Sequence, residues 1–231
     1  MYVPPHLRNT SSDFITNVCD EFLHIDDTPE ASISKCCVCQ NCIRKSVTCI
    51  AQLTEDGNEV YSNVYKNKQS NVTSAIHAEI FMIHDTKLRN SLRNNQSLTL
   101  YLTFQPCHFS GGHYKKNQIS CTESIIHFYE KVLSPLNINL VIKFSYIYRA
   151  HWIYVNPKYS DMIYNAMEGL LLLRQCAKLD VIEESDLHII YKFCDDSEKK
   201  KWDKGLFNEL IFQRKELNVF MKQFITDLGI D

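Results

Sequence analysis

The sequence predicts a three-layer α/β fold around a central mixed sheet of five strands. Runs of β-branched and aromatic residues alternate with stretches whose apolar residues recur at helical spacing. The order along the chain is α-β-β-α-β-α-β-α-β-α-α, and strands that alternate with helices form one sheet covered on both faces. We expect a flexible tail at residues 1–12 and a single domain over residues 13–231, with about six helices flanking the sheet.

Each strand is a short apolar, aromatic or β-branched run between turn residues. The first two strands form a hairpin, because Asp56-Gly57-Asn58 supplies a turn that joins antiparallel strands. The strands are expected at residues 46–53, 59–65, 98–104, 140–148 and 180–183.

The helices follow from apolar residues three or four positions apart. Thr73 or Ser74 can cap the helix before the third strand, and Ser134-Pro135 ends the helix after it. Helices are expected at residues 13–24, 75–93, 120–134, 159–178 and 186–195. A last helix carries Leu210, Leu217, Phe220, Phe224 and Leu228 on one side.

Composition is that of an ordinary globular protein. Hydrophobic residues make up 45% of the 231, and no apolar run approaches the roughly 18 residues that cross a membrane. Because no signal peptide precedes the ten cysteines, we expect a cytoplasmic or nuclear protein without disulfides. The net charge of −2 excludes a uniformly basic nucleic-acid-binding surface but permits a local basic groove.

The most informative pattern joins His77 and Glu79 to Cys107 and Cys121. One histidine and two cysteines can hold zinc and leave a position open for water, whose pKa zinc lowers to about 7. Glu79 can then move protons to and from the substrate. H-x-E followed by P-C-x-x-C is typical of nucleobase deaminases, although here residues 108–120 replace the usual pair between the cysteines.

The third metal ligand has two competitors, because His108 and His113 also lie between the cysteines. We prefer Cys121, since Ser120 can cap the helix that begins there and a ligand at a helix start has a defined position. The positive end of the helix dipole also favours a thiolate.

Three further segments extend this pattern: Thr103-Phe104-Gln105-Pro106-Cys107, Tyr146-Ile147-Tyr148-Arg149 and Lys201-Trp202-Asp203-Lys204-Gly205-Leu206. They resemble segments of the AID/APOBEC-type polynucleotide cytidine deaminases: the Ser-Trp-Ser-Pro-Cys strand end, the pocket for the base before the target, and the Pro-Trp-Asp-Gly-Leu start of the last helix. With the long helical C-terminal half, the resemblance covers roughly residues 13–228.

The resemblance implies a cytidine deaminase-like fold and Zn²⁺-dependent hydrolysis of cytosine to uracil in single-stranded DNA or RNA. It implies that Asn63 contacts the sugar of the target nucleotide and that Phe104 and Tyr148 pack against the base. Such stacking contributes about 1–3 kcal/mol per base. Arg149 replaces the acidic residue frequent after that tyrosine, which leaves the preferred neighbouring base open.

Other features have less specific interpretations. Loop residues that could form a phosphate-binding rim are Arg44, Lys45, Lys66, Lys68, Lys115, Lys116 and Arg149. The cysteines of residues 36–42 could hold half of a second metal site, sense redox changes or simply pack near the first strand. Cys19, Cys176 and Cys194 are expected in the core.

Two alternative functions share the same metal ligands. One is a deaminase of tRNA adenosine or of free nucleosides or nucleotides, against which the long helical C-terminal half argues. The other is a catalytically inactive, zinc-containing nucleic-acid-binding protein, suggested by the stretched cysteine spacing. The retained Glu79 argues against it. The sequence predicts no membrane partner and leaves the oligomeric state open.

Overall fold

The computed structural model describes residues 22, 47–67, 76–109, 119–147 and 160–229. In them, five strands form a sheet in the order β2-β1-β3-β4-β5. The strands are β1 (Thr48–Glu55), β2 (Asn58–Lys66), β3 (Ser97–Phe104), β4 (Asn139–Tyr146) and β5 (Lys178–Val181). β1 is antiparallel to β2 and β3, whereas β3, β4 and β5 are parallel. The predicted mixed sheet is confirmed, and the layout is consistent with a cytidine deaminase-like fold.

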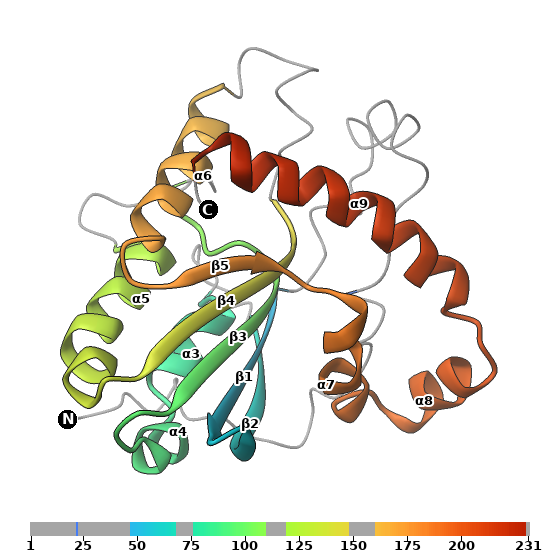
Figure 1. The fold of residues 1–231 in the computed structure, drawn as a ribbon, viewed down its shortest axis with the longest axis horizontal. Helices are drawn as coiled ribbons and strands as arrows, with labels where there is room; N and C mark the ends of the chain where they lie inside the picture. The colour runs from blue at the N-terminus through green and yellow to red at the C-terminus, as the bar shows by residue number, and fades with distance from the viewer. Residues whose placement is uncertain (1–21, 23–46, 68–75, 110–118, 148–159, 230–231) are drawn as a thin grey trace.

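Helices cover both faces of this sheet (Figure 1). The α-helices of the described ranges are α3 (Ala78–Ile83), α4 (Thr86–Ser91), α5 (Cys121–Phe128), α6 (Ser160–Leu173), α7 (Leu187–Lys192), α8 (Asp196–Asp203) and α9 (Asn208–Asp227). Alternation along β3 defines two buried clusters, because Leu100 and Leu102 pack with α3, α5 and α6 while Tyr101 packs with α7. The predicted three layers are therefore present.

The helix expected at residues 75–93 is two helices, because Asp85 interrupts it. The Asp85 carboxylate accepts hydrogen bonds from the backbone amides of Lys87 and Leu88 and so begins α4. The expected caps Thr73 and Ser74 lie outside the described residues. The helix expected at 120–134 also changes form, with a π-helical turn at Tyr129–Leu133 after α5.

The last helix, α9, passes from one layer to the other beyond β5. Phe207, just before α9, packs in the α7 cluster, whereas Met221 and Ile225 pack in the cluster that contains α6. Of the apolar residues expected on one side of this helix, Leu217, Phe224 and Leu228 pack against the core, whereas Phe220 is 50% exposed. No helix in the described ranges has the length and apolarity to span a bilayer.

Candidate metal centre

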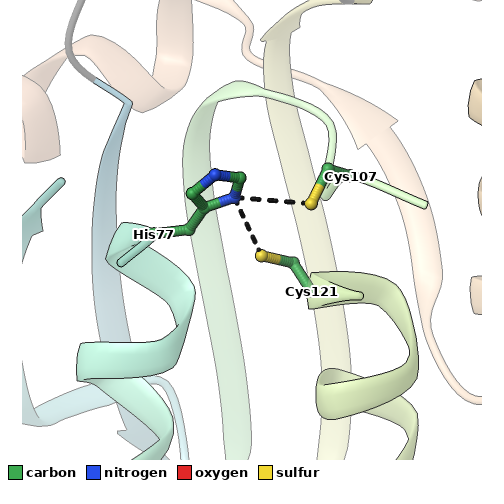
Figure 2. Close-up of side chains that lie close together, drawn as sticks. All are labelled: His77, Cys107 and Cys121. Carbon is green, nitrogen blue, oxygen red and sulfur yellow. Dashed lines mark hydrogen bonds between the residues drawn. The ribbon is translucent and has the colours of Figure 1, made fainter. Parts of the chain in front are cut away.

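Three potential metal ligands meet beyond the carboxyl end of β3. The His77 Nδ1 lies 3.1 Å from the Cys121 Sγ and 3.4 Å from the Cys107 Sγ. All three ligand atoms lie within 4.8 Å of one another. Figure 2 shows one ring nitrogen facing both sulfurs, which belong to free cysteines. This largely buried group could hold a metal ion.

His77 lies at the N-terminus of α3, where its carbonyl accepts the backbone amide of Ile80 at 3.1 Å. The Asn67 side chain, just beyond β2, accepts the backbone amide of Ala78 at 2.9 Å. Asn67 therefore joins the end of β2 to the start of α3 beside the first ligand. The sequence analysis missed this residue, because a polar residue after a strand is too common to be a signal.

The two cysteines are held together by the start of α5. Cys121 is the first residue of α5, and the Ser120 side chain and the Glu123 carboxylate form a reciprocal capping box there. The Thr122 amide donates to the Cys107 carbonyl at 3.1 Å. The predicted cap is confirmed. Together, the cap and the Thr122–Cys107 hydrogen bond bring the two cysteines close to each other despite the long insertion between them.

His108 does not join the ligand group. Its Nδ1 lies 3.2 Å from the Ser120 Oγ, and its Cβ packs against Gly169 of α6, where an added Cβ would come within 2.6 Å. Gly169 thus permits α6 to approach the loop after Cys107. The arrangement favours Cys121 as the third ligand, while His113 lies outside the described residues.

Glu79 lies in the first turn of α3 and is 1% exposed. Its Oε2 has no hydrogen-bond partner among the described residues. Burial raises the pKa of Glu79 to about 7, while the charge of His77 acts in the opposite direction. A carboxyl that is hidden from bulk water and titrates near neutrality is suited to proton transfer.

The pKa values of two ligand side chains, His77 and Cys121, are also shifted. A hydrogen bond with Cys107 raises the pKa of His77 to about 9, although burial acts to lower it. The same partner, followed by burial, raises the pKa of Cys121 well above its ordinary value. Metal ligation requires neutral imidazole and thiolate, so metal binding displaces these protons and strengthens with rising pH.

The predicted substrate residues have different environments. Phe104 ends β3, and its ring centroid lies 5.7 Å from that of Tyr146 at the end of β4. Asn63 lies on β2, where its amide donates to the Asp85 carboxylate at 3.2 Å. Its contact with a nucleotide sugar stays a prediction. Several predicted residues lie outside the described ranges: Tyr148, Arg149, Arg44, Lys45, Lys68, Lys115, Lys116, Cys19 and the cysteines of 36–42.

Arg214 of α9 reaches the same strand ends. It is 3% exposed, and its guanidinium carbon lies 5.1 Å from the centroid of the Tyr146 ring. Burial lowers the pKa of Arg214, while the charge of Tyr146 and a side-chain hydrogen bond with it act in the opposite direction. No sequence signal identified this residue, because helical arginines are usually exposed.

Two further cysteines among the described residues, Cys176 and Cys194, differ in their bonding. Cys176 is half-buried and free, whereas Cys194 is buried and disulfide-bonded. The expectation of unpaired cysteines was therefore wrong for Cys194, since connectivity cannot be read from spacing.

No protein-family model matches the chain, and no curated protein matches it either. The likeness to the polynucleotide cytidine deaminases therefore remains a resemblance of motifs, to which the structure adds the fold and the His77–Cys107–Cys121 group.

Proposed function

We propose that the protein is a zinc-dependent deaminase that hydrolyses cytosine to uracil in single-stranded DNA or RNA. The observation that carries the proposal is the buried Glu79 beside the ligand group, whose Oε2 has no hydrogen-bond partner among the residues that the structure describes. Leaving a buried polar atom without a partner costs about 1–3 kcal/mol. A purely structural metal site has no use for such a carboxyl, whereas a proton carrier requires one.

The donor atoms fit zinc. One imidazole nitrogen and two thiolate sulfurs are ligands that zinc prefers, and three protein ligands are the usual number in catalytic sites. His77, Cys107 and Cys121 would hold the ion. When bound, zinc makes water acidic enough to act as a nucleophile at neutral pH.

Glu79 would carry the protons of the reaction. Its carboxylate would accept a proton from the water as the water oxygen bonds to C4 of cytosine, and would deliver that proton to N3. The hydroxyl on C4 would then lose its own proton, which Glu79 would pass to the exocyclic amino group, so that the C4–N bond breaks and ammonia leaves with uracil as the product. Because burial brings the Glu79 pKa to about 7, the same group can both accept and return a proton.

The aromatic pair Phe104 and Tyr146 supports a substrate with an exposed base. Both residues end parallel strands, and Cys107 follows Phe104 in the next loop. Single-stranded polynucleotide, rather than a free nucleoside, is favoured by the resemblance of the C-terminal half. Lys66 at the end of β2 is the described member of the basic rim.

The test measures zinc content and cytosine-to-uracil conversion on the same protein, with single-stranded DNA and RNA oligonucleotides. We expect one zinc per chain, conversion by the wild type, and no conversion by Glu79→Gln with its zinc retained. Glu123→Gln is the matched control, because it preserves the capping box beside Cys121. Conversion by Glu79→Gln would refute the catalytic assignment, and bound zinc without conversion of either polymer would favour the inactive binding protein.

A further inference from the structure

A side-chain contact closes the base of the insertion between the two cysteine ligands. The insertion comprises residues 108–120, between Cys107 and Cys121. Its first and last residues, His108 and Ser120, are both buried, and the histidine Nδ1 lies 3.2 Å from the serine Oγ. Because this contact joins the two ends of the inserted segment, it restrains the distance between the residues that flank the segment, which are the two ligands.

The direction of this hydrogen bond follows from the other partners of Ser120. Its hydroxyl lies 2.9 Å from the Glu123 carboxylate, which only accepts, so the hydroxyl proton points there. The same oxygen accepts the backbone amide of Glu123 at 3.1 Å. With its one proton engaged, the oxygen accepts from His108, whose Nδ1 therefore carries a hydrogen and donates. The histidine thus adds a third hydrogen bond to the capping box that places Cys121 at the start of α5.

Helix α6 holds the histidine from the other side. Gly169 faces the His108 Cβ so closely that a Cβ added to the glycine would lie 2.6 Å from it. The carboxylate of the preceding residue, Glu168, lies 3.9 Å from the histidine Nε2. One turn earlier, the Asn165 side-chain amide donates to the Phe109 carbonyl at 3.5 Å. Three residues of α6 therefore fix the first two residues of the insertion.

We propose that His108 is a positioning residue for the metal: it donates to Ser120 while it packs on Gly169, and so holds Cys121 at the distance from Cys107 that zinc requires. The contact explains how the insertion is compatible with ligand atoms that lie within 4.8 Å of one another. The inference rests on the metal centre of the proposed function, but it does not depend on deamination.

The test compares His108→Asn with His108→Leu in the full chain. The asparagine amide can take the place of the Nδ1–H donor, whereas leucine fills the space without a donor. Competition with a chromophoric chelator measures zinc affinity. We expect His108→Leu to weaken zinc binding about tenfold, the lower end of what an outer-shell partner contributes, and His108→Asn to stay close to the wild type. A role in packing alone predicts the reverse order, because leucine suits a buried position better than asparagine.

Two further variants control this comparison. His188 also donates through its Nδ1, to the Ser185 carbonyl, but it is exposed on α7, so His188→Leu should leave zinc affinity unchanged. Thermal unfolding of the metal-free variants monitors folding. If His108→Leu does not fold, His108→Gln replaces it, because the longer glutamine side chain carries its amide to the position of Nε2 and leaves Ser120 without the donor.

Gly169→Ala tests the part that α6 takes. Alanine favours a helix over glycine, but its Cβ would overlap the His108 Cβ, so we expect weaker zinc binding. In a His108→Gly background, which lacks the overlapped atom, Gly169→Ala should have little further effect. Equal effects of Gly169→Ala in both backgrounds would show that α6 does not act through His108.

A spectroscopic readout separates ligand geometry from overall stability. Co²⁺ bound in place of zinc has absorption bands that depend on the arrangement of its ligands, and we expect these bands to shift in His108→Leu but not in His108→Asn. Equal zinc affinity and identical Co²⁺ spectra in the wild type and His108→Leu would overturn the inference and leave the proposed function intact. A wild type that binds zinc but converts no cytosine would overturn only the proposed function, and a wild type that binds no zinc would overturn both.

Discussion

Two carboxylates lie at opposite ends of the short helix α3, and they differ in the number of hydrogen bonds that they accept. Glu79, in the first turn, is buried, and its Oε2 has no hydrogen-bond partner within the described ranges. Asp85, just beyond the helix, accepts hydrogen bonds from Tyr61 at 2.6 Å, Tyr65 at 2.7 Å and Asn63 at 3.2 Å, and also caps α4.

The two environments shift the pKa in opposite directions. Burial raises the pKa of Glu79 to about 7. Burial also acts to raise the pKa of Asp85, but hydrogen bonds from Tyr61 and Tyr65 outweigh it, and the pKa is lowered. Asp85 is thus a charged residue that joins β2 to the start of α4, whereas Glu79 keeps the capacity to exchange a proton. Glu79 is also almost fully buried whereas Asp85 is only half-buried, so burial and hydrogen bonding together separate the two roles.

The largest expected effect comes from removing a ligand beside Glu79. Cys121→Ser should weaken zinc binding by more than the roughly 10–100-fold that loss of an outer-shell partner costs. Metal content after dialysis against a competing chelator measures it. Cys176→Ser, at a free cysteine outside the group, should retain zinc. Stoichiometric zinc in Cys121→Ser would reassign the third ligand.

The next prediction concerns the stability of the metal-free protein. Because the folded-state pKa of Glu79, about 7, exceeds its ordinary value of 4.5, folding favours the protonated form. This contribution is fully present below about pH 4.5 and is lost as the pH rises through 7. Glu79→Gln should therefore gain stability over the wild type, by on the order of 3 kcal/mol, at pH 8. Urea unfolding at pH 5 and 8 measures the difference in stability between the wild type and Glu79→Gln. Equal stabilities at pH 8 would contradict the contrast between Glu79 and Asp85.

Asp85→Asn should destabilise the protein at neutral pH, whereas Glu79→Gln should stabilise it. The lowered pKa contributes stability above the ordinary value of 3.8, and this is lost as the pH falls through the folded-state value. We expect the free energy of unfolding to fall by about 1–2 kcal/mol at pH 7. The expected loss is kept small because Asp85 is half-exposed and water screens its charge. The deficit should shrink in urea unfolding at pH 3. Asp56→Asn, in the exposed hairpin turn, should leave the free energy of unfolding unchanged at pH 7 and at pH 3.

Asn63→Ala should have the smallest effect, since it removes only the longest of the three side-chain hydrogen bonds to Asp85. A loss of about 0.5–1 kcal/mol in urea unfolding is expected. Val60→Thr, at an exposed position of the same strand, is the control. A raised KM for cytosine conversion, beyond what the stability change explains, would instead support the predicted sugar contact.

The strand order along the chain, the hairpin and the types of the candidate ligands could be predicted from the sequence. Alternation and turn residues act locally, and His77, Cys107 and Cys121 are recognisable by type and spacing. It also identified Ser120 as a cap, because capping involves only the next few residues.

Which polar groups have partners could not be predicted from the sequence. The bonding of Asn63 to the Asp85 carboxylate and the burial of Arg214 over Tyr146 depend on contacts between distant segments, and so does the environment of Asp85, at which one expected helix divides. Periodicity and propensity describe single elements, whereas hydrogen-bond satisfaction and desolvation depend on how those elements pack.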